Sequence, residues 1–341
     1  HIPQHYVQCN EHIMQKIKTS IGDNYICISA DETIDTLGRS VVNFSKIFEC
    51  ALIDKIYNHV IVQLNINQHG FIKGRSTCTN LCDYTQYLSG CLDKKLQIDV
   101  IYTDMSKAFD KVDYHILIHC LDKFSFSPNL LKLFDSMLRG RHQFVEYCGF
   151  RSCLYAASSG VTQGSNLGPL LFNVFINGIF DVLDPSCKAY LYADDLKIAK
   201  IINTPEDCFI LQNTLNRIVA WCVQNKLMVN KSKCYTISFY HKLSTILFDY
   251  SIDNVVLNRY TEIRDLGITL DSTLSFFPHV SNICNEVMKL LGFIVRNTKG
   301  FANTDSLICL YQFLVRSKLE YCSEVWNPCY AVHIDKLERV Q

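Results

Sequence analysis

The sequence has no excess of charge of either sign. Its 33 Lys and Arg residues are balanced by 33 Asp and Glu residues, and charged residues make up only 19% of the chain. Nucleic-acid-binding proteins are usually basic, so this balance counts mildly against nucleic-acid binding. It does not exclude it, because a neutral protein can hold a locally basic channel. Hydrophobic residues make up 48%, which can fill a large core and argues against a disordered chain.

Paired cysteine motifs and long apolar runs are also missing. The 17 cysteines include no C-x-x-C pair and no Cys/His cluster with zinc spacing, and Cys78 and Cys82 are spaced wrongly for one. Scattered cysteines in odd number indicate small apolar residues in a reducing compartment.

The most apolar long stretch, 166–183, contains three Asn residues and a Gly-Pro pair, which predicts a buried helix and not a membrane span. The start, HIPQHYVQCN, lacks the apolar core of a signal peptide, and its first residue, His1, indicates a fragment. We therefore expect an intracellular, soluble protein that is not secreted.

From about residue 44 the chain alternates helices and strands. Apolar spacing predicts a helix over 44–64, and the β-branched run QIDVIYT predicts a strand over 97–103. Ser127 followed by Pro128 is a helix start signal. The other predicted elements are a helix over 113–124 capped by Asp113, a hairpin over 142–158, strands within 187–202, a helix over 206–225, a strand over 234–240 and a largely helical region over 275–341. Elements interleaved without a βαβ rhythm predict an α+β fold, an antiparallel sheet backed by helices.

The most informative feature is Asp194-Asp195 in YLYADDLKIA, which we expect at the turn of a hairpin. Strands disfavour Asp, and adjacent carboxylates repel each other. A plain solvated turn is the alternative explanation. The apolar flanks, however, predict that the hairpin is buried and that its tip is one of the few polar points there.

A second carboxylate, Asp104, follows the predicted strand over 97–103. Carboxylates from two strand ends can converge on a hard divalent cation such as Mg²⁺. Two such ions can activate an attacking hydroxyl and stabilise a leaving oxygen in phosphoryl transfer. The loop SGVTQGSNLGP adds three glycines, which let backbone approach a ligand, and the amide of Gln163. This chemistry is that of nucleotide addition.

Six segments in order resemble the reverse transcriptase of non-LTR (LINE-type) retrotransposons, most of all the jockey and chicken-repeat type. They are NQHGFIKGRST, DVIYTDMSKAFDKVDYHIL, SGVTQGSNLGPLLFNVFING, LYADDLKI, WCVQNKLMVNKSKC and DLGITLD. The resemblance implies a right-hand polymerase with a palm, partial fingers and a helical thumb. It also implies an RNA-directed DNA polymerase, a nucleotidyltransferase that adds nucleotides to a primer 3′-hydroxyl by two-metal catalysis. The implied ligands are two Mg²⁺ ions, with Mn²⁺ as the alternative, an RNA template, a DNA primer or target and deoxynucleoside triphosphates.

The resemblance also implies site residues. Asp104, Asp194 and Asp195 would hold the metal ions, and Asp194 matches the more essential ligand of the Tyr-x-Asp-Asp pair. Lys233, with Lys231 as the fallback, would lie near the leaving pyrophosphate as a catalytic residue. The nucleotide-binding residues would be Lys73 and Arg75 for the triphosphate, Phe109 against the ribose 2′-hydroxyl, and Asp110, Gln163 and Gly164. The turn Leu266-Gly267 matches the primer grip.

The same resemblance gives expected domain boundaries. Residues 44–271 would form the fingers and palm, and 272–341 a truncated thumb. Residues 1–43 differ from the rest, and SADETIDTLGR faintly resembles a transposase with a ribonuclease-H-like fold, as a fusion remnant would. Asp31 or Asp35 would then be a relic, because one carboxylate without partners cannot hold a metal pair. The resemblance also implies action in the nucleus and cytoplasm and no membrane, and the sequence does not indicate which protein partners the chain has.

Two alternatives stay open on the sequence alone. The chain could be a truncated, catalytically silent relic that at most binds nucleic acid. The intact trio of aspartates speaks against this, and altered fingers speak for it. A metal-dependent nuclease or transposase is the other alternative, and it would need a competent set of carboxylates in the N-terminal segment, where only one candidate cluster is found.

Overall fold

The computed structural model divides the chain into two compact units. The helical unit comprises Phe109–Phe175 with the described part of His1–Gln63, and the sheet unit comprises Leu64–Ala108 and Ile176–Gln341. The expectations for 1–43, with Asp31 and Asp35, lie outside the described residues. The structure describes residues 44–341 except Phe144, Val145, Cys148, Gly149, Gln163, Lys242, Leu243, Ala302, Cys329 and Gln341.

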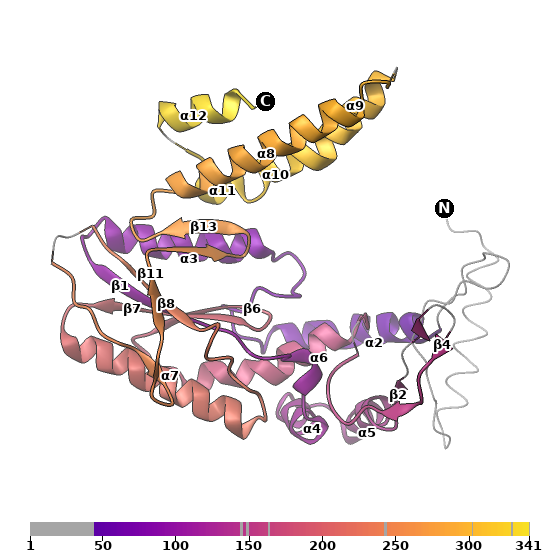
Figure 1. Cartoon of the computed structure of the whole chain (residues 1–341). Helices are drawn as coiled ribbons and strands as arrows, with labels where there is room; N and C mark the ends of the chain where they lie inside the picture. The colour runs from indigo at the N-terminus through magenta and orange to yellow at the C-terminus, as the bar shows by residue number, and fades with distance from the viewer. Residues whose placement is uncertain are drawn as a thin grey trace. The chain divides into compact units, whose positions relative to one another are not determined.

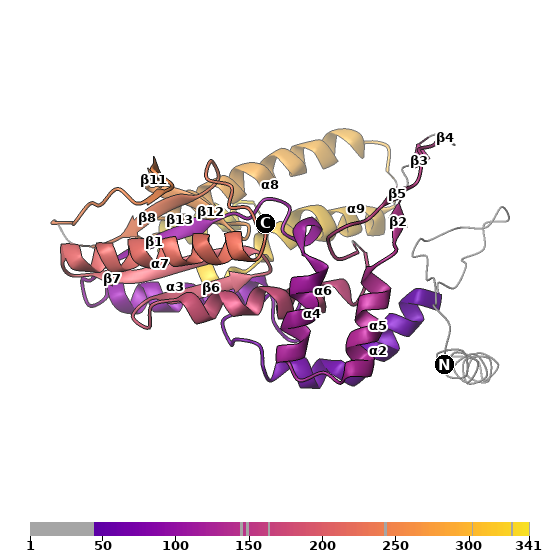
Figure 2. The same cartoon turned by 90° about the horizontal axis from the view of Figure 1, so that it is seen from below.

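Helices make up most of the described part of the helical unit. Its elements are α2 (Phe44–Ile61), η1 (Phe109–Lys111), α4 (Tyr114–Lys123), α5 (Pro128–Leu138), the ladders β2 (His142–Gln143) with β5 (Tyr155–Ala156) and β3 (Glu146–Tyr147) with β4 (Phe150–Arg151), and most of α6 (Gly168–Ile176). The predicted capping is confirmed, because the Asp113 carboxylate accepts the first N–H groups of α4 and the Ser127 hydroxyl accepts one from α5. The nested ladders confirm the predicted hairpin, and α4 packs against α5 (Figure 2).

The sheet unit holds a five-stranded sheet in the order β11-β8-β1-β7-β6. Its strands are β1 (Gln97–Thr103), β6 (Lys188–Tyr192), β7 (Asp195–Ile202), β8 (Tyr235–Phe239) and β11 (Asn258–Tyr260). Every pairing is antiparallel except that of β11 with β8. The antiparallel sheet and the interleaved helices confirm the predicted α+β class.

Helices cover both faces of this sheet, and all seven residues of β1 are buried. Figure 1 shows α3 (Thr77–Leu92) over one face and α7 (Pro205–Gln224) over the other. Alternation along β1 turns Ile98, Val100 and Tyr102 toward α3, where they join its Leu81 and Leu88 in one core. The helix predicted within 166–183 is α-helical up to Ile176 and continues as the tighter 3-10 turn η2 (Asn177–Val182). This turn packs against α7.

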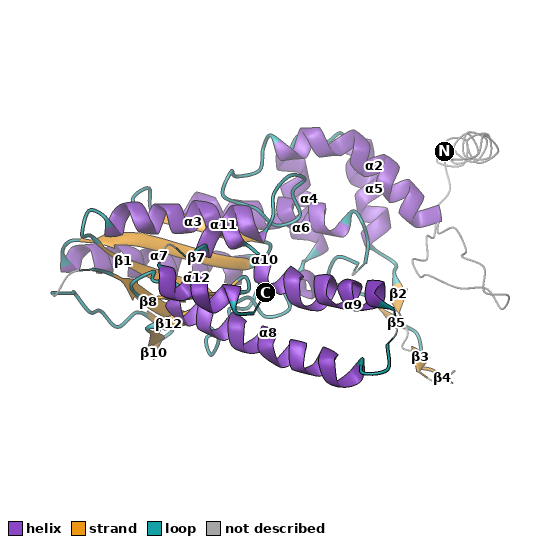
Figure 3. Ribbon diagram, turned by 90° about the horizontal axis from the view of Figure 1, so that it is seen from above, coloured by secondary structure: helices purple, strands orange, loops and turns teal. Residues whose placement is uncertain are grey.

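Two hairpins and a helical region complete the sheet unit. The hairpins are β9 (Ser251–Ile252) with β10 (Val255–Val256) and β12 (Glu262–Asp265) with β13 (Ile268–Asp271). The helices are α8 (Phe277–Asn297), α9 (Thr304–Tyr311), the π-turn η3 (Gln312–Arg316), α10 (Ser317–Glu320), α11 (Ser323–Trp326) and α12 (Ala331–Glu338), which confirm the predicted helical C-terminal region (Figure 3). Helix α8 packs against β13, and α11 packs against α3. None of the helices described has both the length and the apolar character needed to cross a membrane.

Candidate active site

The ends of two interior strands, β1 and β7, place carboxylates at one end of the sheet. The antiparallel register of β1 and β7 places Thr103 opposite Leu196. The next residue along β1 is Asp104, and the residue before Leu196 is Asp195, so the register places these two aspartates at adjacent positions. The backbone after β1 is held by the segment before Lys231, because Asn230 N–H donates to the Asp104 carbonyl at 2.8 Å.

The third aspartate lies in the turn of the β6–β7 hairpin. Tyr192 pairs with Asp195, which leaves Ala193 and Asp194 as a two-residue turn. The structure therefore refines the prediction, because Asp194 lies in the turn and Asp195 is the first residue of β7. Ala193 has φ of 57°, a left-handed conformation that a residue with a Cβ adopts only at a cost. Contacts from outside the turn are therefore needed to stabilise this conformation of Ala193.

The three carboxylates act on one another electrostatically. Burial, and then Asp104, raise the pKa of Asp194. Asp195 is accessible to solvent, yet partial burial and then the carboxylates of Asp194 and Asp265 raise its pKa to about 6. Crowded carboxylates are an oxygen donor set whose repulsion a hard divalent cation would offset. The donor type and the charge thus fit Mg²⁺, although within the described residues no three His, Cys, Asp or Glu side chains are gathered as a ready metal cluster.

Lys233 lies beside the first of these carboxylates. Its Nζ is 3.8 Å from Asp104 Oδ2, and both side chains reach solvent. The two residues line a cavity of about 520 Å³ together with Asp195. The fallback residue Lys231 instead pairs with Asp253 at 2.8 Å. The structure thus brings Lys233, and not Lys231, to the aspartates.

A buried ion pair that sequence reasoning missed lines the same cavity. Lys197 Nζ is 2.6 Å from Asp265 Oδ2, with side chains only 1% and 4% exposed. Tyr102 donates to the same carboxylate oxygen at 3.0 Å, and Lys197 donates to Asn80 Oδ1 at 2.9 Å. Lys197 also lies over the ring of Tyr84. The pair therefore joins β7, two residues after Asp195, to β12.

The predicted primer-grip turn joins β12 to β13. Asp265 pairs with Ile268, so Leu266 and Gly267 form a two-residue turn with φ of 43° and 92°. Tyr321 donates its hydroxyl to the Leu266 carbonyl at 2.8 Å. A Cβ at position 267 would lie 2.9 Å from the Tyr321 ring, so glycine is needed there for space as well as conformation. The helical C-terminal region thus contacts this turn directly.

The predicted triphosphate-binding residues lie in the loop between α2 and α3. Lys73 is exposed in a turn that precedes Gly74, whose φ is 81°. Arg75 donates from one guanidinium nitrogen to the carbonyls of Ile66 and Gln68, both at 2.5 Å. Arg75 therefore has a loop-closing role within its own segment, which the sequence did not predict.

The other predicted nucleotide-binding residues belong to the helical unit. Phe109 begins η1, and its ring stacks on Phe172 with centroids 4.0 Å apart. Asp110 is exposed, and its carbonyl accepts the hydroxyl of Ser159. Gly164 has φ of 80° in the turn before α6, and Gln163 lies outside the described residues. Each of these roles stays a prediction.

The loop that contains Gly164 is anchored by a residue that the sequence did not single out. One carboxylate oxygen of Glu49, on α2, accepts the hydroxyl of Ser165 and the backbone N–H groups of Asn166 and Leu167. These donors precede α6, where an acceptor side chain satisfies backbone groups that would otherwise lack partners. Sequence reasoning missed Glu49 because it lies more than a hundred residues from its partners.

Comparison with known proteins supplies the family context of this site. Residues 42–294 match the family model described as "Reverse transcriptase (RNA-dependent DNA polymerase)". The "Probable RNA-directed DNA polymerase from transposon BS" of Drosophila melanogaster is 27% identical over 88% of this chain and 34% of its own length. The "RNA-directed DNA polymerase from mobile element jockey" of Drosophila funebris is 25% identical over 80% of this chain and 31% of its own. The chain thus spans about a third of the length of these relatives.

Among solved structures, a telomerase from Candida tropicalis, truncated from its C-terminal domain, is similar at a TM-score of 0.49. It is 13% identical and covers 72% of this chain and 50% of its own. A likeness at this level adds nothing to the family match.

Proposed function

This chain belongs to the reverse transcriptase (RNA-dependent DNA polymerase) family, and on that premise we propose that it catalyses RNA-directed DNA synthesis. Its similarity to the jockey and transposon BS polymerases identifies a reverse transcriptase of the non-LTR retrotransposon type. On this proposal the five-stranded sheet would be the palm. The silent-relic alternative gains no support, because the five-stranded sheet, the β6–β7 hairpin and the three candidate aspartates are all present.

The placement of Asp104 and Asp195 at adjacent register positions, with Asp194 in the turn between β6 and β7, carries the proposal. The three residues come from segments about 90 positions apart, and burial together with the neighbouring carboxylates raises the pKa values of Asp194 and Asp195. Asp104, Asp194 and Asp195 would hold two Mg²⁺ ions, or Mn²⁺ in their place. When bound, these ions supply positive charge that polarises the triphosphate and favours ionisation of the primer hydroxyl.

In the proposed reaction the primer 3′-oxygen forms a bond to the α-phosphorus of a deoxynucleoside triphosphate. The bond from the α-phosphorus to the bridging oxygen breaks, pyrophosphate leaves, and the hydroxyl proton passes to solvent. Lys233, beside Asp104, would stabilise the negative charge that develops on the leaving pyrophosphate. Its exposure lets it reach a ligand in the cavity that it lines.

The remaining roles rest on the resemblance of the motifs. Lys73 and Arg75 would contact the triphosphate, and Asp110, Gln163 and Gly164 would line the nucleotide and template side. Phe109 would exclude a ribose 2′-hydroxyl by steric contact. The partners would be an RNA template and a DNA primer or target, so we propose that the protein acts in the nucleus and cytoplasm. The boundaries at residues 43 and 271 remain part of the same proposal.

A homopolymer assay tests this function. The protein is incubated with a poly-riboadenylate template, an oligo-deoxythymidine primer, deoxythymidine triphosphate and Mg²⁺, with a chelator in a parallel reaction. We expect primer extension that the chelator abolishes. A folded protein that binds the primer-template but extends nothing with either Mg²⁺ or Mn²⁺ would support the silent relic.

Phe109→Val is expected to weaken sugar selection. A smaller side chain would leave room for a 2′-hydroxyl, and selection by side-chain size is worth about tenfold to a hundredfold. The measurement is the ratio of kcat/KM for deoxythymidine and uridine triphosphates on the same template. Phe172→Leu is the control, because it removes the same ring stacking from the other side. Equal ratios in the parent and the Phe109→Val variant would contradict the role of Phe109.

A further inference from the structure

We infer that Gln68 is a positioning residue for the catalytic turn, whose buried carboxamide holds Ala193 and thereby sets the position of Asp194. The inference rests on the proposed function and adds a residue to it. The motif that contains Gln68 was expected to contact the triphosphate. Its contacts indicate a second task, which is to brace the hairpin that carries two of the three aspartates.

Both backbone polar groups of Ala193 are bound by this single side chain. Gln68 is 1% exposed, and its Oε1 accepts the Ala193 N–H at 3.1 Å while its Nε2 donates to the Ala193 carbonyl at 3.3 Å. The same Oε1 accepts the N–H of Gly70 at 2.8 Å. A carboxamide is suited to this task because it has a donor and an acceptor side by side. These bonds offset the cost of the left-handed Ala193 and favour one turn conformation.

The segment around Gln68 is itself docked on the hairpin. Residues 67–69 lie beside β6 as a short parallel bridge, in which His69 N–H donates to the Leu191 carbonyl at 2.9 Å and Leu191 N–H donates to the Asn67 carbonyl at 3.0 Å. Gly70 lies against the turn so closely that a Cβ there would be 2.2 Å from the Ala193 nitrogen. Gln68 thus hydrogen-bonds the N–H and the carbonyl of Ala193, and Gly70 packs against the backbone of the same residue.

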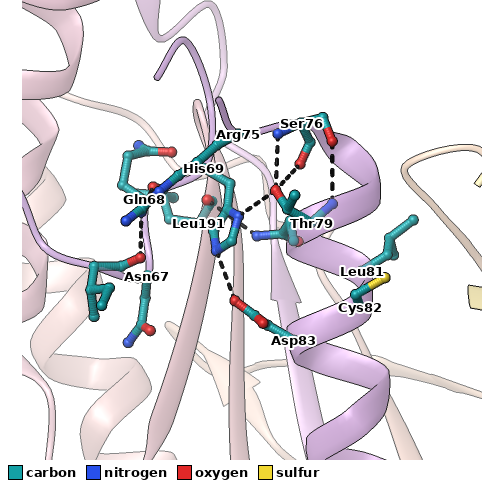
Figure 4. A network of polar contacts seen from close by, with 12 residues as sticks. Asn67, Gln68, His69, Arg75, Ser76, Thr79, Leu81, Cys82, Asp83 and Leu191 are labelled. Carbon is teal, nitrogen blue, oxygen red and sulfur yellow. Dashed lines mark hydrogen bonds and ion pairs between the residues drawn. The ribbon is translucent and has the colours of Figure 1, made fainter. Parts of the chain in front are cut away.

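The brace is anchored on α3 as well. The buried His69 ring has its Nδ1 2.9 Å from Thr79 Oγ1 and its Nε2 3.3 Å from Asp83 Oδ2 (Figure 4). Arg75 closes the loop from the other side through the carbonyls of Ile66 and Gln68. Because His69 on one side and Arg75 on the other fix the backbone of Gln68, its carboxamide is held at a set distance from α3, and this sets the position of the turn. A surface glutamine could not do this.

Two substitutions test the inference. Gln68→Met keeps the length and shape of the side chain but removes its hydrogen bonds, and Gly70→Ala pushes on the Ala193 backbone. We expect kcat for incorporation to fall about 100-fold in each, since a displacement of about 1 Å at reacting groups has that effect, while KM for the triphosphate stays unchanged. Gln68→Glu keeps the acceptor for the Ala193 N–H and should lie between Gln68→Met and the parent. Thr85→Val is the matched control, because it deletes a buried hydrogen bond elsewhere on α3 and should keep the parental kcat.

A binding readout separates this inference from the proposed function. Mn²⁺ binding to the substrate-free protein is measured by electron paramagnetic resonance, for the parent, Gln68→Met and Thr85→Val. We expect weaker Mn²⁺ binding in Gln68→Met only, even if none of the proteins extends a primer. Equal Mn²⁺ binding and equal kcat in Gln68→Met and the parent would overturn the role of Gln68 and leave the polymerase proposal standing. Absent extension by a parent that binds Mn²⁺ would instead contradict the polymerase proposal.

Discussion

Asp194→Asn is expected to lower the rate of nucleotide incorporation about a thousandfold. This is the upper end of the range for loss of one group that stabilises developing charge. The amide keeps the size of the side chain but removes the negative charge that would hold a divalent cation. Folding should not suffer, because Asp194 sits where burial and Asp104 already oppose its charged form. The measurements are single-turnover incorporation and thermal unfolding of both proteins.

The control for this experiment is Asp122→Asn, which removes one carboxylate from an exposed position on α4. It should retain the parental rate. Asp104→Asn should match Asp194→Asn, because the proposed metal ions would need both carboxylates. If Asp194→Asn kept most of the parental rate in a folded protein, the assignment of the metal site would be wrong.

Lys197→Met is expected to destabilise the protein by about 3–5 kcal/mol, the usual cost of leaving one buried charge without its partner. The remaining Asp265 carboxylate is 4% exposed and would keep its bond from Tyr102 but lose the charge that balances it. Urea unfolding monitored by circular dichroism gives the difference in free energy of unfolding. Lys318→Met is the control, since it breaks an exposed pair with Glu286 and should cost about 1 kcal/mol or less.

Combining Lys197→Met with Asp265→Asn should recover most of the lost stability. Burial lowers the pKa of Lys197, because removing the ammonium from water opposes its charged form. Removing both charges therefore removes the penalty together with the attraction. A double variant no more stable than Lys197→Met would show that the fold depends on the pair itself.

The elements that local patterns determine were predicted correctly. Ser127 and Pro128 begin α5, and Asp113 caps α4, because a capping residue acts on backbone only two or three positions away. The strand before Asp104 was predicted from its β-branched run, and β1 has the same bounds. The candidate aspartates were found because each lies at a strand end or in the hairpin turn, where a charged residue interrupts an apolar run.

Contacts between distant segments could not be predicted. Lys197 and Asp265 are separated by 68 positions in the sequence. Gln68 and Ala193 are separated by 125 positions. Nothing in the sequence near Gln68 indicates that its amide is buried. The same limit applies to Glu49, whose three donors lie in a loop that follows several other elements. One sequence contains no signal for such pairs, because each residue alone is compatible with an exposed position.

The most direct test of the central claim is to sequence the DNA made by the purified protein on a heteropolymeric RNA template. A homopolymer product could come from untemplated addition, whereas a product complementary to a mixed sequence requires template reading. The reaction contains a DNA primer, all four deoxynucleoside triphosphates and Mg²⁺, with the Asp194→Asn variant in parallel. We predict DNA complementary to the RNA from the parent and none from the variant. Untemplated product, or equal product from both proteins, would contradict RNA-directed synthesis at this site.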